Sequence, residues 1–149
     1  MKKILFVCTG NTCRSAMAAA IMADIAEKND LDVVVDSAGV FATIGECAAD
    51  NAIEAVKKYG IDLSLHRTKP LTEELIDMAD VILVMTDAHK MLIESMAKEK
   101  VFTLLEFAGD EGDISDPYGG DMDEYEETAE EIYDSLVYIA EKLPVIDEE

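Results

Sequence analysis

Eight consecutive residues near the N-terminus combine side chains that could bind a phosphate group and attack it. The segment CTGNTCRS comprises Cys8, Thr9, Gly10, Asn11, Thr12, Cys13, Arg14 and Ser15. An apolar run precedes it, and an alanine- and methionine-rich stretch follows it. A strand that turns tightly into a helix N-terminus aims several backbone N–H groups at one point and forms an anion cradle. In such a cradle Arg14 would supply a forked guanidinium for phosphate oxygens, and Cys8 would be the nucleophile.

The loop around Cys8 is expected to support a thiolate. The positive field at a helix N-terminus favours the thiolate form of a nearby cysteine. We expect Ser15 to donate a hydrogen bond to that thiolate, and Asn11 to bond across the loop and hold it taut. The segment lacks the Gly-Lys-Ser/Thr ending of nucleotide-binding phosphate loops. The remaining phosphate-binding candidates are Thr9, Gly10, Thr12 and Cys13.

A candidate acid lies far along the chain, in the segment Asp116-Pro117-Tyr118-Gly119-Gly120. A thiolate that attacks phosphorus needs an acid to protonate the leaving group. Asp116 precedes a proline, which biases its backbone toward an extended conformation and holds the carboxyl group in a defined place. We therefore expect Asp116 to be the general acid and Tyr118 to form an aromatic wall of the pocket. Without the first motif, this segment would predict only an ordinary turn.

The elements that must position these loops alternate along the chain. Strands are expected at four apolar, β-branched runs, 3–7, 31–37, 81–85 and 101–104. Helices are expected at five amphipathic stretches, 15–29, 48–59, 72–78, 87–98 and 123–143. Ser15, Thr72 and Thr86 are predicted helix caps, and Gly60 is a predicted helix stop. A long loop is expected over 108–121.

This alternation predicts an α/β fold, a three-layer sandwich with a four-stranded parallel sheet and helices on both faces. In such sheets, ligands bind beyond the carboxyl ends of the strands, where the strand order reverses. The rule places the phosphate-binding loop after the first strand and the loop with Asp116 at the same edge. The chain shows no repeat and no linker, so one domain is expected over 1–149.

The composition suits a globular domain with an unusual charge. The chain has 149 residues, of which 50 % are hydrophobic and 30 % charged, and its net charge is −21. Nucleic acids and anionic membranes need a basic footprint, so we expect neither as a partner. From Glu106 onward Lys142 is the single basic residue, and we attribute the acidity to solubility or to adaptation to a salty cytoplasm. The methionines predicted to pack in the core include Met17, Met22, Met78 and Met85.

The N-terminus and the cysteines indicate a cytoplasmic protein. No apolar run approaches the roughly 20 residues that span a bilayer. The apolar start over 1–7 is too short for a signal peptide, which predicts a mature cytoplasmic N-terminus. Three cysteines make an odd number, unlike a secreted disulfide framework. Their spacing predicts no zinc site, and His66 and His89, which stand alone, are expected to be structural or exposed.

The segment CTGNTCRS together with Asp116-Pro117-Tyr118 resembles the low-molecular-weight protein tyrosine phosphatases. The resemblance covers essentially the whole chain, including Ser37-Ala38-Gly39. It implies that Cys8 takes the phosphoryl group while Asp116 protonates the leaving atom, and that Asp116 then activates the water that hydrolyses the cysteinyl phosphate. It also implies that Arg14 and the loop amides stabilise the equatorial oxygens. It further implies a phosphorylated protein as substrate, inorganic phosphate as product, and no metal or organic cofactor.

Within that family, the chain is most similar to the bacterial protein-arginine phosphatase branch. Thr12 stands where the tyrosine phosphatases usually carry a bulky aliphatic residue, and Val40-Phe41-Ala42 and Gly119-Gly120 also resemble the arginine branch. The resemblance therefore implies phosphoarginine as substrate. A physical argument supports it, because the N–H donors of a phosphoguanidinium need acceptors, which Thr12 and Asp116 offer. A buried donor left without an acceptor costs about 1–3 kcal/mol.

Three other functions remain open at this point. A phosphotyrosine phosphatase is the first, since Tyr118 and Phe41 could enclose a phenol ring. An arsenate reductase of the same fold would need a cysteine relay near the third strand, where residues 81–98 contain no cysteine and Cys47 is badly placed. A silent phosphate-binding module should lack the nucleophile, the arginine or the acid, and all three are present. The chain also departs from the family where Ala16 replaces a common proline.

Overall fold

A four-stranded parallel sheet organises the protein, and the structure, a computed structural model, describes residues 2–143 apart from the side chain of Lys98. The strand order is β2-β1-β3-β4. The strands are β1 (Lys2–Cys8), β2 (Val33–Gly39), β3 (Val81–Val84) and β4 (Val101–Thr103). The predicted four-stranded parallel sheet is confirmed. The single domain over 1–149 stays a prediction, and residues 1 and 144–149 lie outside the described residues.

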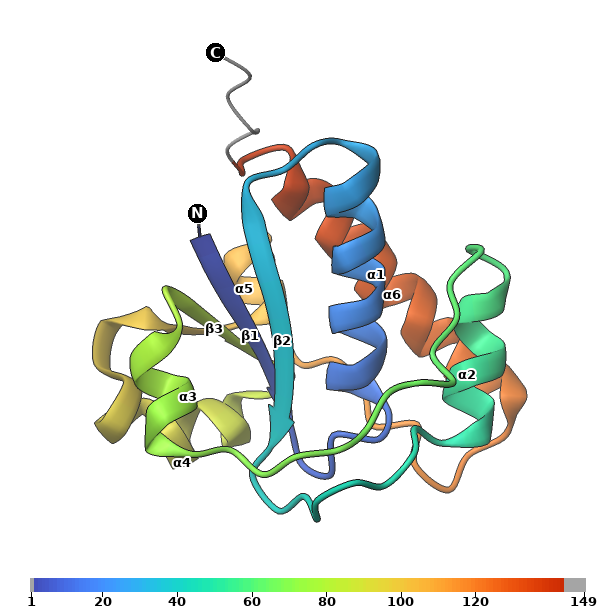
Figure 1. Cartoon of the computed structure of the whole chain (residues 1–149), viewed down its shortest axis with the longest axis horizontal. Coiled ribbons are helices and arrows are strands. Elements are labelled where there is room, and N and C mark those ends of the chain that lie inside the picture. Colours follow the sequence, from blue (N-terminus) through green and yellow to red (C-terminus); the bar gives the residue numbers. More distant parts are fainter. Residues whose placement is uncertain (1, 144–149) are drawn as a thin grey trace.

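Helices cover both faces of this sheet (Figure 1). The first face carries α1 (Arg14–Lys28), α2 (Asp50–Lys57) and α6 (Met122–Ala140). The second face carries α3 (Glu73–Met78) and α4 (Asp87–Ala97). A 3₁₀ turn over Lys98–Lys100 leads into β4. The short helix α5 (Leu104–Phe107) follows β4 and packs against the core of the first face. The predicted three-layer sandwich is therefore confirmed.

The central strand β1 is buried on both sides. Ile4 and Phe6 belong to the core beneath α1, α2 and α6, whereas Leu5 and Val7 belong to the core beneath α3 and α4. This two-sided burial explains why the strand is continuously apolar in sequence. Cys8 ends the strand on the side of the first core and is 3 % exposed. The strand thus delivers the candidate nucleophile to the sheet edge, next to the N-terminus of α1.

The strand order reverses beside β1. From β1 the chain crosses through α1 to β2 on one side, and it later returns through β3 on the other side. Open α/β sheets bind ligands at such a switch point, beyond the carboxyl ends of the strands. The loop over 9–13, which joins β1 to α1, lies at this position (Figure 1).

Most predicted helix ends are confirmed to within a few residues. The hydroxyl group of Thr72 accepts a hydrogen bond from the N–H of Leu75, and that of Thr86 accepts one from the N–H of His89, so both predicted caps are confirmed. Gly60 follows α2 with a φ of +77°, a backbone conformation that glycine adopts without a steric penalty. None of the helices within 2–143 has the length and apolar character that crossing a bilayer requires.

Two details differ from the sequence predictions. Met78, predicted as core, is 54 % exposed because it is the last residue of the short helix α3, whereas Met17, Met22 and Met85 are fully buried. The helix α5 was not predicted. It has only four residues, which is too short for a hydrophobic period, and its cap is the Thr103 hydroxyl, which accepts from the N–H of Glu106 at 3.1 Å.

Candidate active site

A pocket of about 310 Å³ opens beyond the carboxyl end of β1. Three loops line it: the segment 8–14 after β1, the segment 41–46 after β2, and Asp116 with Tyr118 from the long loop after β4. Sequence analysis identifies the first and third of these loops and, from the second, names only Phe41 and Ala42. Of the candidate site residues, the pocket is lined by Cys8, Thr9, Gly10, Thr12, Cys13, Arg14, Asp116 and Tyr118.

Ser15, at the start of α1, and Asn11, within the loop, support Cys8. The Sγ atom of Cys8 is 2.9 Å from the Oγ atom of Ser15. Because Nδ2 of Asn11 donates to that Oγ at 2.8 Å, the proton of the Ser15 hydroxyl can point at the sulfur. This geometry fits the hydrogen bond expected from Ser15. The predicted cap role of Ser15 is wrong, because α1 already begins at Arg14 and the hydroxyl serves the loop instead of a free helix N–H.

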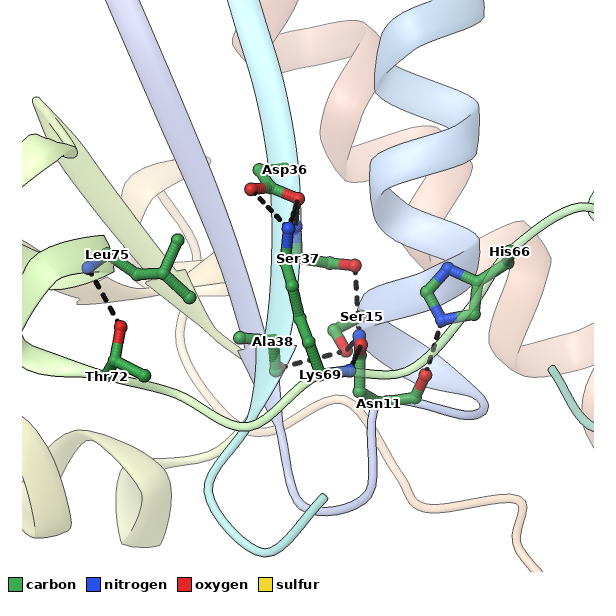
Figure 2. A network of polar contacts seen from close by, with 9 residues as sticks. All are labelled: Asn11, Ser15, Asp36, Ser37, Ala38, His66, Lys69, Thr72 and Leu75. Atoms are coloured by element: carbon green, nitrogen blue, oxygen red, sulfur yellow. Dashed lines mark hydrogen bonds and ion pairs between the residues drawn. The ribbon is translucent and has the colours of Figure 1, made fainter. Parts of the chain in front are cut away.

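Asn11 holds the loop in shape through every polar atom of its buried side chain (Figure 2). Its φ of +60° lies in the left-handed region, which asparagine tolerates better than most residues. Nδ2 also donates to the Oγ of Ser37 at 3.0 Å, and Oδ1 accepts from the N–H of Lys69 at 3.2 Å. His66 donates from Nε2 to the Asn11 carbonyl oxygen at 2.7 Å. The loop is therefore tied to β2 and to the segment before α3.

Sequence analysis names Ser37 and His66 but does not predict that they hold Asn11, and it does not single out Lys69. All three are distant from Asn11 in the chain and form no local pattern with it, so nothing in the sequence predicts these contacts. Lys69 also forms an ion pair with Asp36 at 2.6 Å, which fixes its segment beside β2 (Figure 2). Burial lowers the pKa of His66, which favours the neutral ring. The proton on Nε2 then points at the carbonyl oxygen of Asn11. Of the two expectations for His66, structural or exposed, this contact agrees with the first.

Gly39 marks the closest approach of β2 to the phosphate loop. A Cβ at this position would lie 2.5 Å from the carbonyl oxygen of Thr9 and 2.9 Å from the backbone nitrogen of Asn11. No side chain can occupy that space without moving the loop backbone, so only glycine fits. The segment Ser37-Ala38-Gly39 thus has a physical role: Ser37 binds Asn11, and Gly39 lets the phosphate loop pack closely against β2.

Arg14 joins the phosphate loop to the loop of the candidate acid. The residue is 4 % exposed, and its Nη1 donates to the carbonyl oxygen of Ile114 at 3.0 Å. Its Nη2 lies 3.4 Å from Oδ2 of Asp116, whose side chain is 53 % exposed. Solvent weakens such a half-exposed ion pair. Because a guanidinium carries five N–H donors, Arg14 can keep the Ile114 contact and still bind phosphate oxygens.

The candidate acid is oriented by its own turn. The N–H of Gly120 donates to the carbonyl oxygen of Pro117 at 2.8 Å, which closes a turn, and Gly119 occupies it with a φ of +81°. Oδ1 of Asp116 accepts from the N–H of Tyr118 at 3.1 Å. The carboxyl group is thereby directed toward the pocket, and the Tyr118 ring, 77 % exposed, stands at the pocket wall as expected.

His89 of α4 supports the loop from the second face of the sheet. Its Nε2 lies 2.9 Å from the Oγ1 of Thr9, and the residue is 5 % exposed. Burial, with the nearby Arg14 charge as a second cause, lowers the pKa of His89. Its Nδ1 is the one buried side-chain N or O atom of the described residues without a hydrogen-bond partner. Of the two expectations for His89, structural or exposed, this buried placement agrees with the first.

Cys13 is a buried thiol at the back of the pocket. Its Sγ lies 3.4 Å from the hydroxyl oxygen of Tyr125 and 3.6 Å from the Oγ1 of Thr12. Burial raises the pKa of the Cys13 thiol, so the protonated form prevails at neutral pH. The cysteines are free in the structure. Within 2–143, no three side chains of histidine, cysteine, aspartate or glutamate converge as a metal site would require.

We expect hydrogen peroxide to inactivate the protein reversibly by joining Cys8 and Cys13. Peroxide would oxidise the Cys8 thiolate to a sulfenic acid and release hydroxide, and the Cys13 thiol would then displace water and form the disulfide. The raised pKa of Cys13 predicts that this second step accelerates as the pH increases. Peptide mapping after peroxide treatment, with and without a reductant, detects the bond. The disulfide would protect Cys8 from further, irreversible oxidation. Full recovery of a peroxide-treated Cys13→Ala variant by reductant would contradict this protection by Cys13.

Comparisons with known proteins place the chain among phosphatases. The family model of the low molecular weight phosphotyrosine protein phosphatases matches residues 3–145. The protein-arginine-phosphatase of Bacillus subtilis strain 168 is 47 % identical over 144 residues, which are 94 % of this chain and 95 % of that protein. The match therefore spans both motifs and the segments that support them.

Two solved structures are similar over almost their whole length. A cysteine-to-serine variant of the YwlE arginine phosphatase with a phosphorylated active-site serine has a TM-score of 0.90 and 46 % identity, and the match covers 94 % of both chains. A low molecular weight protein tyrosine phosphatase from T. tengcongensis has a TM-score of 0.92 and 45 % identity, covering 96 % of this chain and 100 % of that one. The overall similarity therefore does not distinguish phosphoarginine from phosphotyrosine as the substrate.

Proposed function

The chain belongs to the low molecular weight phosphotyrosine protein phosphatase family, and from this premise we propose that it is a protein-arginine phosphatase. One observation carries the proposal: a single pocket is lined by Cys8, Arg14 and Asp116 and also by Thr12, whose hydroxyl group can accept a hydrogen bond. A cysteine phosphatase needs the first three. A substrate with N–H donors next to phosphorus needs the fourth.

The proposed reaction has two steps. The Cys8 thiolate attacks phosphorus, so that an S–P bond forms and the P–N bond breaks, while Asp116 gives its proton to the leaving nitrogen. The Asp116 carboxylate then takes a proton from a water molecule, which attacks the cysteinyl phosphate and releases inorganic phosphate. Arg14 and the loop N–H groups bind the equatorial oxygens. The Ser15 hydroxyl, 2.9 Å from the sulfur, stabilises Cys8 as the thiolate before attack and as the leaving group.

Two side chains at the pocket wall support phosphoarginine as the substrate. The hydroxyl oxygen of Thr12 has two lone pairs, so it can accept from a guanidinium N–H while it contacts the Cys13 sulfur at 3.6 Å. Glu46, an exposed residue that sequence analysis missed, lines the same pocket. Its backbone is fixed because its N–H donates to the Oγ1 of Thr68 and its carbonyl accepts from the N–H of the same residue. An acidic wall repels a bare phosphate ester but suits a donor-rich guanidinium.

Substitution of Thr12 by isoleucine tests the substrate directly. The acceptor is lost and an apolar contact is gained, so phosphoarginine turnover should fall by about 5- to 150-fold while phosphotyrosine turnover stays equal or increases. The measurement is kcat/KM on matched phosphoarginine and phosphotyrosine peptides. Thr12→Val is the matched control, since it removes the hydroxyl group with almost no change in size, and it should reproduce the loss on phosphoarginine.

Two results would contradict the proposal. One is a wild-type preference for phosphotyrosine, and the other is a proportional loss on both substrates in Thr12→Ile. Hydrolysis of a small aryl phosphate is the internal control, because Cys8 and Arg14 are unchanged in both variants. A loss of that activity would mean that the loop itself had been disturbed.

A phosphotyrosine phosphatase is the second candidate, and the aromatic wall favours it. Phe41 and Tyr118 both line the pocket and are 76 % and 77 % exposed, so they could enclose a phenol ring as readily as an arginine stem. Thr12 and Glu46 weigh against this candidate, because a phenol ring next to phosphorus offers neither residue a donor.

We also propose that the substrate is a phosphorylated protein in the cytoplasm. The free thiols at Cys8, Cys13 and Cys47 suit a reducing compartment. With a net charge of −21, the chain offers little basic surface to nucleic acids or anionic lipids. Inorganic phosphate would be the product.

A further inference from the structure

An apolar groove of about 280 Å³ lies next to the active-site pocket, on the second face of the sheet. Its lining residues come from α3 and the two residues before it, from α4, and from the start of the loop after β2. Buried Ile76 and Ile93, each 2 % exposed, line it and belong to the core of this face. The exposed large apolar residues at the groove are Phe41 at 76 %, Leu92 at 54 % and Met96 at 47 %. These apolar side chains are exposed on a protein with a net charge of −21.

Phe41 makes the groove continuous with the active site, because its side chain lines both the groove and the pocket around Cys8. A phosphorylated side chain that reaches Cys8 enters a pocket of which this aromatic ring is one wall. A substrate residue that flanks it on the Phe41 side of the pocket would pass over the groove. The groove is therefore placed to contact the substrate protein, whichever side chain carries the phosphate.

We propose that this groove binds an apolar side chain, such as leucine or phenylalanine, that flanks the phosphorylated residue of the protein substrate. The volume suits one large side chain and is too small for a folded element. Its lining is mostly apolar, with Glu73 as the one charged residue of the described lining. The gain would come from removing that side chain from water against Leu92, Met96 and Phe41. This inference rests on the proposed function only in that a phosphoprotein is the substrate.

A peptide series tests the groove on the full chain. Leucine is compared with serine at each position on either side of a phosphoarginine, and kcat and KM are measured separately. We expect leucine at one position to raise kcat/KM by about tenfold, mainly through a lower KM, because burial of an apolar side chain is worth at least that factor. A parallel series on phosphotyrosine peptides tests this proposal independently of whether the protein prefers phosphoarginine or phosphotyrosine, since the flanking effect should appear there too.

Two substitutions on α4 localise the effect. Leu92→Ser removes an exposed apolar side chain from the groove, and Met91→Ser makes a similar change at its neighbour, which is 68 % exposed and does not line the groove. Leu92→Ser should abolish the leucine preference, whereas Met91→Ser should retain it. Free phosphoarginine, which has no flanking residue, should be hydrolysed equally by both variants and by the wild type.

Several outcomes would overturn the proposal. Equal rates for the leucine and serine peptides at every position would exclude an apolar subsite. An equal effect of Met91→Ser, or a loss of free-phosphoarginine hydrolysis in Leu92→Ser, would show that the substitution acts on the structure of α4. A concentration-dependent dimer that Leu92→Ser dissociates would assign the groove to a second copy of this chain.

Discussion

Replacing Cys8 with serine should reduce turnover by at least about a thousandfold while phosphate binding is retained. The anion cradle is formed by backbone N–H groups and by Arg14, and none of these changes in the variant. The serine hydroxyl, in contrast, does not ionise as a thiol does, so the attack on phosphorus becomes slow. Asn11 and Ser15 would still hold the loop, because their hydrogen bond at 2.8 Å does not involve Cys8.

Three measurements decide this prediction. Turnover is measured on phosphoarginine peptides, phosphate binding by calorimetry, and the protein mass after incubation with substrate. Since a cysteine-to-serine variant of a related arginine phosphatase carries a phosphorylated active-site serine, a mass gain of one phosphoryl group would support attack from this position. Cys47→Ser is the matched control, because Cys47 is exposed and does not line the pocket, and it should keep wild-type turnover. Residual turnover of Cys8→Ser above about a thousandth would contradict a covalent mechanism.

The sequence predicts the site to the extent that its parts are local. The segment from Cys8 to Ser15 lies between a continuously buried strand and a helix, and each of these has a clear hydrophobic pattern. The type of each element therefore determines the position of the loop. Asp116 could be assigned from a distance because parallel strands bring their carboxyl ends to one edge.

The contacts that shape the loop could not be predicted. Asn11 depends on His66 and Lys69, which reach it only after β1, β2 and the segment before α3 have packed together. Of the two roles predicted for Ser15, the contact with the Cys8 sulfur fits the structure and the helix cap is wrong, because α1 begins one residue earlier than the sequence pattern indicates. Glu46 enters the pocket from a loop without a motif, and nothing local distinguishes it from other surface glutamates.

Substitution of Asp116 should slow the reaction by about 10²- to 10⁴-fold for substrates with poor leaving groups, and by much less for activated aryl phosphates. A poor leaving group needs a proton as its bond to phosphorus breaks, whereas an activated phenolate departs without one. Asp116→Asn is the sharper variant. Its amide oxygen can still accept from the N–H of Tyr118, so the turn is preserved while the transferable proton is lost.

The ion pair with Arg14 adds a second expected result for Asp116→Asn. In the wild type, Nη2 of Arg14 lies 3.4 Å from the Asp116 carboxylate, which competes with phosphate for the guanidinium. Removal of that negative charge should tighten the binding of inorganic phosphate even as kcat falls. A simple disruption of the pocket would weaken both. Product inhibition by phosphate, measured with kcat on the same samples, separates these two explanations.

The control for Asp116 comes from the same loop. Asp110→Asn makes an identical change of charge at an exposed position that does not line the active-site pocket, and it should leave both kcat and phosphate inhibition unchanged. An equal loss of rate on activated and poor leaving groups in Asp116→Asn would show that Asp116 is not the acid.

The proton would then have to come from another group at the pocket. Glu46 is the carboxylic acid that would remain, since it lines the same pocket from the loop after β2. A double substitution of Asp116 and Glu46 tests whether both residues supply the proton. If the rate falls no further than in Asp116→Asn, Glu46 is not an acid in the reaction and contributes to substrate recognition alone.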